Sequence, residues 1–218
     1  MNHLKIAATT AIAACLSGAA TADHISVLAD LIANDGTIQV GDKLFSNFDY
    51  AATGDMPDAD NINVIEYTDS DGNFGIRFQA GFFDLPGGGS SDALITFDVT
   101  VLDPNRMISG AHLAGNPDVL GGNGGSSFGG ITETFLTGNT SDSLSIFATQ
   151  DSAVLADWVF FDTPTSTLSV QKNITLFADD DAVATTLSFV DQTFTQIPEP
   201  GSLALIGLGG LALLRRRR

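Results

Sequence analysis

The chain has 218 residues, enough for one domain of ordinary size once terminal signals are set aside. Apolar residues make up 44% of it, which allows a packed core and excludes a disordered chain. Residues 23–197 hold four basic and 25 acidic side chains, a net charge of −21, and this excludes nucleic acid and anionic lipid headgroups as partners, because both bind through cationic side chains.

Residues 1–22 have the features of a secretory signal peptide. A short basic region is followed by an apolar stretch, and the segment ends on an Ala-x-Ala sequence formed by Ala20 and Ala22. Signal peptidase recognises such an ending after an apolar core of this length. We therefore expect cleavage after Ala22 and a mature chain that starts at Asp23. The alternative is that this segment forms the first helix of the fold.

The only cysteine, Cys15, lies inside this leader. The stretch IAAC around it is similar to the lipobox of bacterial lipoproteins, in which the cysteine is lipidated and becomes the new N-terminus. We favour cleavage by signal peptidase, which leaves the mature protein without a cysteine. The body then has neither a disulfide nor a thiol nucleophile.

The body alternates apolar and polar residues with the period of two that is typical of β-strands. In chain order, we expect strands at residues 24–32, 37–50, 63–67, 74–80, 93–101, 107–113, 132–136, 144–149, 154–161, 168–176 and 185–194. The apolar face of the strand at 168–176 includes Lys172. The strand at 185–194 alternates at Leu187 and Phe189 and then becomes less regular.

Turn-forming segments such as DSDGN, LPGGGSSD and DTPTS separate these strands. Strands at this spacing, without a convincing amphipathic helix of about 12 residues, predict an all-β fold. We expect a β-sandwich or jelly roll over residues 23–194, with an N-terminal signal helix before it and a short C-terminal transmembrane helix after it. The 15 phenylalanines would fill the space between the two sheets.

The body offers no recognisable catalytic residues. It has no Gly-x-Ser-x-Gly sequence, and a Ser-His-Asp triad would depend on His112 alone. No two histidines have the spacing of zinc ligands. Acidic pairs are abundant, but a glycosidase needs two acids at a defined separation inside a cleft. We therefore expect a protein that is not an enzyme.

Aromatic side chains that could stack on sugars are few. The body has one tryptophan, Trp158, and two tyrosines, Tyr50 and Tyr67. The surrounding stretch LADWVFFD has apolar residues at both odd and even positions, so alternation allows either face for the indole. We expect Trp158 in the core or half-buried rather than on a sugar-binding surface.

Calcium is the one cofactor that the sequence suggests. The loop TDSDGN offers Asp69, Asp71 and Asn73 at alternate positions, and hard oxygen ligands in a tight loop are typical of calcium sites. The glycine at position 72 is two places early for a helix-loop-helix site, and no bidentate glutamate follows. A β-hairpin turn rich in Asp and Gly explains the same residues, and we prefer it.

The tail has three parts, namely Pro198-Glu199-Pro200, an almost wholly apolar segment at 202–214, and Arg215, Arg216, Arg217 and Arg218. As a helix the apolar segment is about 20 Å long, which is short for a bilayer core of about 30 Å. The arginines would stay on the cytoplasmic side, which places the body across the membrane. The prolines keep the preceding chain extended, and we expect a linker at 195–200.

These three parts, in this order, resemble the PEP-CTERM sorting signal of Gram-negative and related bacteria. The resemblance implies that the tail holds an exported protein in the inner membrane. It also implies processing near the motif by exosortase, a membrane-embedded enzyme that resembles cysteine proteases, and delivery to the cell surface or an extracellular polysaccharide matrix. The alternative is an ordinary C-terminal anchor that is never cut.

The resemblance covers only the tail, so the role of the body stays open. Our main hypothesis is an exported, surface- or matrix-sorted structural protein that is not an enzyme and associates with extracellular polysaccharide in a biofilm. The alternatives are a carbohydrate-binding module or adhesin and a small secreted hydrolase. An exposed aromatic strip around Trp158 would favour the carbohydrate-binding module, and a cleft with two buried acids would favour the hydrolase.

Overall fold

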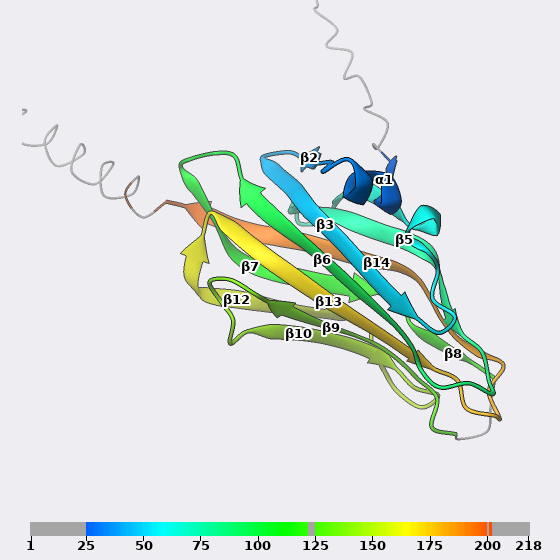
Figure 1. Ribbon diagram of the computed structural model, residues 1–218. Coiled ribbons are helices and arrows are strands. Elements are labelled where there is room, and N and C mark those ends of the chain that lie inside the picture. The colour runs from blue at the N-terminus through cyan, green and yellow to red at the C-terminus, as the bar shows by residue number, and fades with distance from the viewer. Residues whose placement is uncertain (1–24, 122–124, 200, 202–218) are drawn as a thin grey trace, which may run out of the picture.

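The computed structural model describes residues 25–121, 125–199 and 201 (Figure 1). The expected signal peptide with Ala20 and Ala22, the third motif residue Pro200, the apolar segment at 202–214 and the four terminal arginines lie outside the described residues. Within the described part of the chain, no helix combines the length and apolarity needed to cross a membrane.

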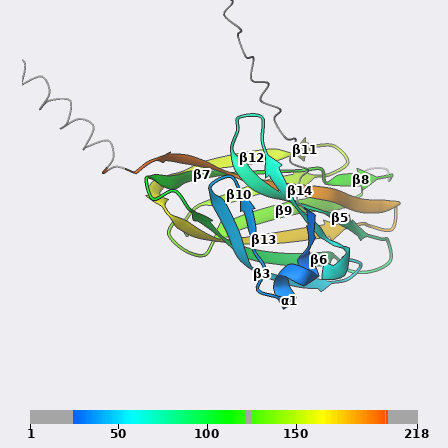
Figure 2. The same ribbon diagram turned by 90° about the horizontal axis from the view of Figure 1, so that it is seen from above.

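Two antiparallel sheets of seven strands each form the body (Figures 1 and 2). Sheet A has the order β1 (Ile25–Val27), β4 (Asn63–Thr68), β5 (Phe74–Asp84), β14 (Ala184–Pro198), β7 (Arg106–Gly115) and β12 (Ala156–Thr165), and β8 (Asp118–Leu120) also pairs with β14. Sheet B has the order β11 (Ala153–Val154), β10 (Ser143–Ala148), β9 (Phe128–Phe135), β13 (Thr167–Phe177), β6 (Ser91–Val101), β3 (Lys43–Thr53) and β2 (Ile38–Val40). The predicted β-sandwich is confirmed.

The core between the sheets follows the predicted alternation. In β6 every second residue is buried, namely Ala93, Ile95, Phe97, Val99 and Val101. The rings of Phe45, Phe78 and Phe97 pack together across the sandwich, with Phe97 6.1 Å from Phe45 and 5.8 Å from Phe78 between ring centroids. Eight of the 15 phenylalanines are buried in the core and Phe74 packs against it, so fewer phenylalanines fill the core than expected.

The first predicted strand, at 24–32, is wrong over most of its length. After the short strand β1 the chain forms the helix α1 (Leu28–Ala33), and a 3-10 turn η1 (Ala59–Asn61) lies against it. Leu28, Leu31 and Ile32 have the i, i+3, i+4 spacing of a helix that packs one face on a core, and Leu28 and Leu31 are buried. This spacing is present in the sequence and predicts a helix rather than a strand.

Strand β14 contains a register shift between Leu187 and Phe189. Leu187 is buried in the core, whereas Phe189 lies on the outer face against Arg77, 4.4 Å from its ring centroid to the guanidinium carbon. The two residues were expected on one face, and the shift places them on opposite faces. It also explains why the alternation becomes irregular at this point.

Strand β14 also extends further than expected. Residues 195–198, predicted as part of a linker, continue the strand, and Pro198 pairs with Arg106. The Glu199 amide then donates a hydrogen bond to the Asn105 carbonyl at 2.6 Å. The first two residues of the Pro-Glu-Pro motif are therefore held at the end of the folded body.

Candidate functional site

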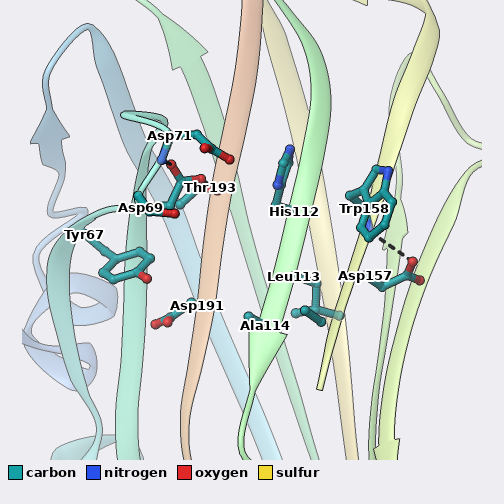
Figure 3. Close-up of a pocket in the computed structure, with 12 residues that line it drawn as sticks. Tyr67, Asp69, Asp71, His112, Leu113, Ala114, Asp157, Trp158, Asp191 and Thr193 are labelled. Carbon is teal, nitrogen blue, oxygen red and sulfur yellow. Dashed lines mark hydrogen bonds between the residues drawn. The ribbon is translucent and has the colours of Figure 1, made fainter. Parts of the chain in front are cut away.

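A row of residues crosses the outer face of sheet A. Backbone pairing places Tyr67 on β4 opposite Gly75 on β5, Gly75 opposite Thr193 on β14, Thr193 opposite His112 on β7, and His112 opposite Trp158 on β12. The row lines a depression of about 170 Å³, to which the loop with Asp69 and Asp71 also contributes (Figure 3). This depression is our candidate site.

The strand β12 forms one wall of the depression and the edge of sheet A. Trp158 is 63% exposed and Phe160 is 66% exposed, while Phe161 is buried. The expectation that Trp158 lies in the core or half-buried is therefore wrong. Val159 and Phe161 take the inward positions, so the indole faces solvent. An exposed tryptophan on a sheet edge is the kind of feature that marks a binding surface.

The centre of the row is occupied by Gly75, which has no side chain. A Cβ atom at this position would lie 1.8 Å from the carbonyl oxygen of Gln192 and 2.8 Å from the Cα of Thr193. These distances leave no room for any side chain, so β5 and β14 can approach only because residue 75 is glycine. Gly75 therefore places no side chain between Tyr67 and Thr193.

An ion pair supports the tyrosine side of the depression. Arg77 binds Asp191 in a bidentate manner, with 2.5 Å between Nε and Oδ1 and 2.7 Å between Nη2 and Oδ2. The guanidinium carbon also lies 4.9 Å from the Tyr67 ring centroid. Hydrogen bonding to Asp191 raises the pKa of Arg77, and burial, followed by the Asp191 charge, raises the pKa of Tyr67. The Tyr67 ring is thus fixed in place by a charged group that is itself neutralised.

The loop between β4 and β5 folds around Asp69. Its Oδ1 accepts hydrogen bonds from the amides of Asp71 at 3.0 Å and Asn73 at 2.9 Å. Its Oδ2 accepts from the Asn73 side chain at 2.9 Å and from the Thr193 hydroxyl at 2.8 Å. Burial acts to raise the pKa of Asp69, but these hydrogen bonds outweigh it and lower the pKa. Gly72, with φ of +83°, completes the turn.

This geometry fits a calcium site poorly. Both oxygens of Asp69 face protein donors, and the Asn73 side chain bonds to Asp69 rather than presenting an oxygen beside it. Among the residues that the structure describes, no three His, Cys, Asp or Glu side chains are grouped so as to hold a metal ion. Asp69, Asp71 and Asn73 form the hairpin turn that we preferred, and calcium binding stays an untested prediction.

The remaining polar groups show what the depression can do chemically. Asp157 accepts hydrogen bonds from the amides of Ser145 and Trp158, both at 2.9 Å, so its carboxylate has a structural partner, as do those of Asp69 and Asp191. His112 has a buried Nε2 atom for which the described residues provide no hydrogen-bond partner. The exposed indole of Trp158 and the half-buried ring of Tyr67, with fixed polar groups between them, suit a ligand that stacks and hydrogen-bonds.

Sequence reasoning singled out five residues that meet here, namely Tyr67, Asp69, Asp71, His112 and Trp158. It did not connect them, because they belong to three segments, at 67–71, 112 and 158, whose neighbourhood in the sheet is not visible locally. It also missed Arg77, Asp191 and Thr193. Their signal was weak: each is a polar residue at an outward position of a strand, where polar residues are ordinary.

The tail of the chain is similar to a known sorting signal. The PEP-CTERM protein-sorting motif matches residues 196–218. The chain carries a PEP-CTERM sorting motif. The PEP-CTERM motif indicates export and membrane-associated sorting to the cell surface, and it implies processing by exosortase, a membrane enzyme. The match begins at Gln196, so this sorting motif starts inside strand β14.

Beyond the tail, three solved structures share part of the fold of this chain. No curated protein matches the chain. The enzymatically active domain of tailspike protein 4 from bacteriophage CBA120 is similar over 68% of this chain and 19% of its own, with 13% identity and a TM-score of 0.31. The module TmCBM61 in complex with β-1,4-galactotriose is similar over 69% of this chain and 88% of its own, with 9% identity and a TM-score of 0.30.

A third solved structure, the xylan-binding module CBM15, is similar over 74% of this chain and 97% of its own, with 16% identity and a TM-score of 0.28. None of these three likenesses assigns a function to the body of this chain.

Proposed function

We propose that the body is a polysaccharide-binding module on an exported, surface-sorted protein, and that the depression on sheet A is its binding surface. The observation that carries this proposal is the exposure of Trp158 at one end of the depression, whose opposite end holds the fixed ring of Tyr67 (Figure 3). It favours the carbohydrate-binding alternative over a purely structural role in the matrix, which would not require an exposed indole.

The binding mode follows from the chemistry of the two rings. A pyranose ring has an apolar face of C–H groups that can stack on an indole or phenol, with its hydroxyl groups directed outward. Between the rings, Asp71 and His112 line the depression and present polar groups to it, whereas the Thr193 hydroxyl is bonded to Asp69 (Figure 3). The protein would hold the polysaccharide without transforming it, so we propose that it is not an enzyme.

The charge of the body limits the ligand to neutral polysaccharides or to those that carry amino groups. Four carboxylates and one arginine surround the depression, namely Asp69, Asp71, Asp157, Asp191 and Arg77. A uronic acid polymer would bring its own negative charges against this surface, and such repulsion is costly where the charges are close.

The sorting tail completes the proposal. Exosortase would act near Pro198-Glu199-Pro200 while Arg215 to Arg218 keep the end of the chain on the cytoplasmic side. Release would place the body on the cell surface or in the extracellular polysaccharide matrix of a biofilm. A binding module at that location would attach to the polymer that surrounds the cell.

The test is affinity electrophoresis of the protein, as processed and released by the cell, through gels that contain single polysaccharides. The panel is cellulose derivatives, xylan, galactan, partly deacetylated chitin, alginate and the producing cell's own polymer. We expect at least one neutral or amino-bearing polymer to retard the protein. Trp158→Ala should weaken that binding by about tenfold or more, as loss of a central aromatic anchor does.

The matched control is Phe83→Ala, because Phe83 is an exposed aromatic residue of β5 that does not line the depression. It should bind like the wild type. Binding that is unchanged in Trp158→Ala, or the absence of binding to every polymer, would show that the depression is not the site. Retardation by alginate alone would show that the ligand class is wrong.

A further inference from the structure

Three polar side chains meet in the apolar core, away from the depression. Lys172 on β13 and Glu133 on β9 extend from sheet B, and Gln192 on β14 extends from sheet A. All three are fully buried. The Nζ atom of Lys172 donates hydrogen bonds both to Oε2 of Glu133 and to Oε1 of Gln192. An amine, a carboxyl group and a primary amide are therefore in direct contact between the two sheets.

A permanent ion pair at this buried position would carry a large desolvation cost, because both charges are removed from water. Well-packed apolar side chains at such a position often make a protein at least as stable. The second oxygen of Glu133, Oε1, has no hydrogen-bond partner in the described structure. Burial raises the pKa of Glu133 and lowers the pKa of Lys172. Both directions favour a neutral amine beside a carboxylic acid.

These are the parts needed for acyl transfer. A neutral amine is a nucleophile, a carboxamide is an acyl donor, and a carboxyl group in contact with the amine can move a proton between them. The surrounding core excludes water, which would otherwise compete for the acyl group. The three groups reach one another only when the two sheets are packed, so the reaction would follow folding.

We propose that Lys172 and Gln192 form an isopeptide bond in the folded protein, with Glu133 as the group that transfers the proton. The lone pair of Nζ attacks Cδ of Gln192, so that the Nζ–Cδ bond forms and the Cδ–Nε2 bond breaks. Glu133 takes a proton from Nζ and gives one to Nε2, which leaves as ammonia. Nothing is oxidised or reduced, and no other reactant is needed.

The bond would join the sheets between β13 and β14, across 20 residues of sequence. A second lysine offers a comparison inside the same core. Lys43 donates to Oε1 of Gln196 at 2.8 Å, but its acidic partner is Asp42, whose side chain is 21% exposed. This second pair lacks a carboxyl group enclosed with it, so we assign the bond to Lys172 and Gln192.

The experiment is peptide mapping of the full chain, purified from the cell, denatured and digested with trypsin. Trypsin does not cut after an acylated lysine. We therefore expect the segment from residue 107 to stay joined past position 172 and to be lighter by one ammonia than its sequence. Fragmentation should assign the bond to Lys172 and Gln192. Glu133→Gln, which keeps the volume of the side chain, should show the full mass and cleavage after Lys172.

The wild type alone decides the question, so the result does not depend on the folding of the variant. Cleavage after Lys172 in the wild-type protein, with both product peptides at their full mass, would overturn the proposal. So would a loss of ammonia that maps to Lys43 and Gln196 while Lys172 remains free.

Discussion

Gly75 provides the sharpest test of the packing that underlies the depression. In Gly75→Ala, the new Cβ would lie 1.8 Å from the Gln192 carbonyl oxygen, whereas ordinary contact begins at 3.4 Å. The nearest atoms belong to the backbone of β14, so no side-chain rotation relieves the clash. Strand β5 must therefore move away from the central strand of sheet A, and we expect a cost of about 3 kcal/mol, the upper end of the range for overpacking.

For a domain of this size, that cost should lower the melting temperature by roughly 6–12 °C. Circular dichroism of the full chain during heating measures it. Gly81→Ala is the matched control, because Gly81 lies on the same strand and a Cβ there meets nothing within 4 Å. The control should melt at or slightly above the wild-type temperature. If both variants lose the same stability, or if Gly75→Ala loses none, the close approach of β5 and β14 is not as described.

Three further variants test single interactions. Arg77→Met should lower the free energy of unfolding, measured in urea, by about 3 kcal/mol, because the Asp191 carboxylate is only 5% exposed and would lose its partner. A loss near zero would mean that the ion pair contributes nothing to stability. Burial and the Asp58 charge raise the pKa of Tyr50 to about 12. The protonated tyrosine therefore contributes its full stabilisation below about pH 10, and this contribution is lost as the pH rises toward about 12. Tyr50→Phe should remove this alkaline loss of stability in melting experiments. The pKa of Asp69 is lowered by its hydrogen bonds in spite of burial, so the carboxylate stabilises the fold fully above its unfolded pKa of 3.8 and loses this effect as the pH falls through the folded pKa. Asp69→Asn should therefore flatten the loss of stability at acid pH. An unchanged loss would contradict the role given to these hydrogen bonds.

Local alternation predicted most of the fold because strands have a period of two and each had one apolar face. It failed at residues 28–33, where the apolar residues have helical spacing, and at Leu187 and Phe189, where a register shift reverses the faces. The alternation also placed the end of the folded body too early in the chain. Gln196 belongs to the body through a side-chain hydrogen bond from Lys43, and this contact forms only when the two sheets pack together.

The site was much less predictable than the fold. Strand β14 lies between β5 and β7, although about 70 residues or more separate it from either in the sequence, and this order creates the depression. The side of the sheet that Trp158 faces was undetermined, because its neighbours are apolar at both parities. Lys172 fell on an apolar face in the sequence, but its partners Glu133 and Gln192 are recognisable only as polar residues at inward positions of two other strands.

Trp158 is the only tryptophan of the chain, so its fluorescence reports directly on the proposed binding surface. The decisive measurement is a titration of the wild-type protein with the polymer that retards it most in affinity electrophoresis, recording emission and quenching by acrylamide. We expect a saturable change in emission and protection of the indole from acrylamide, with the same midpoint as the binding measured by retardation. Polysaccharide binding that leaves both the emission and the quenching of Trp158 unchanged would contradict the assignment of the depression as the binding site.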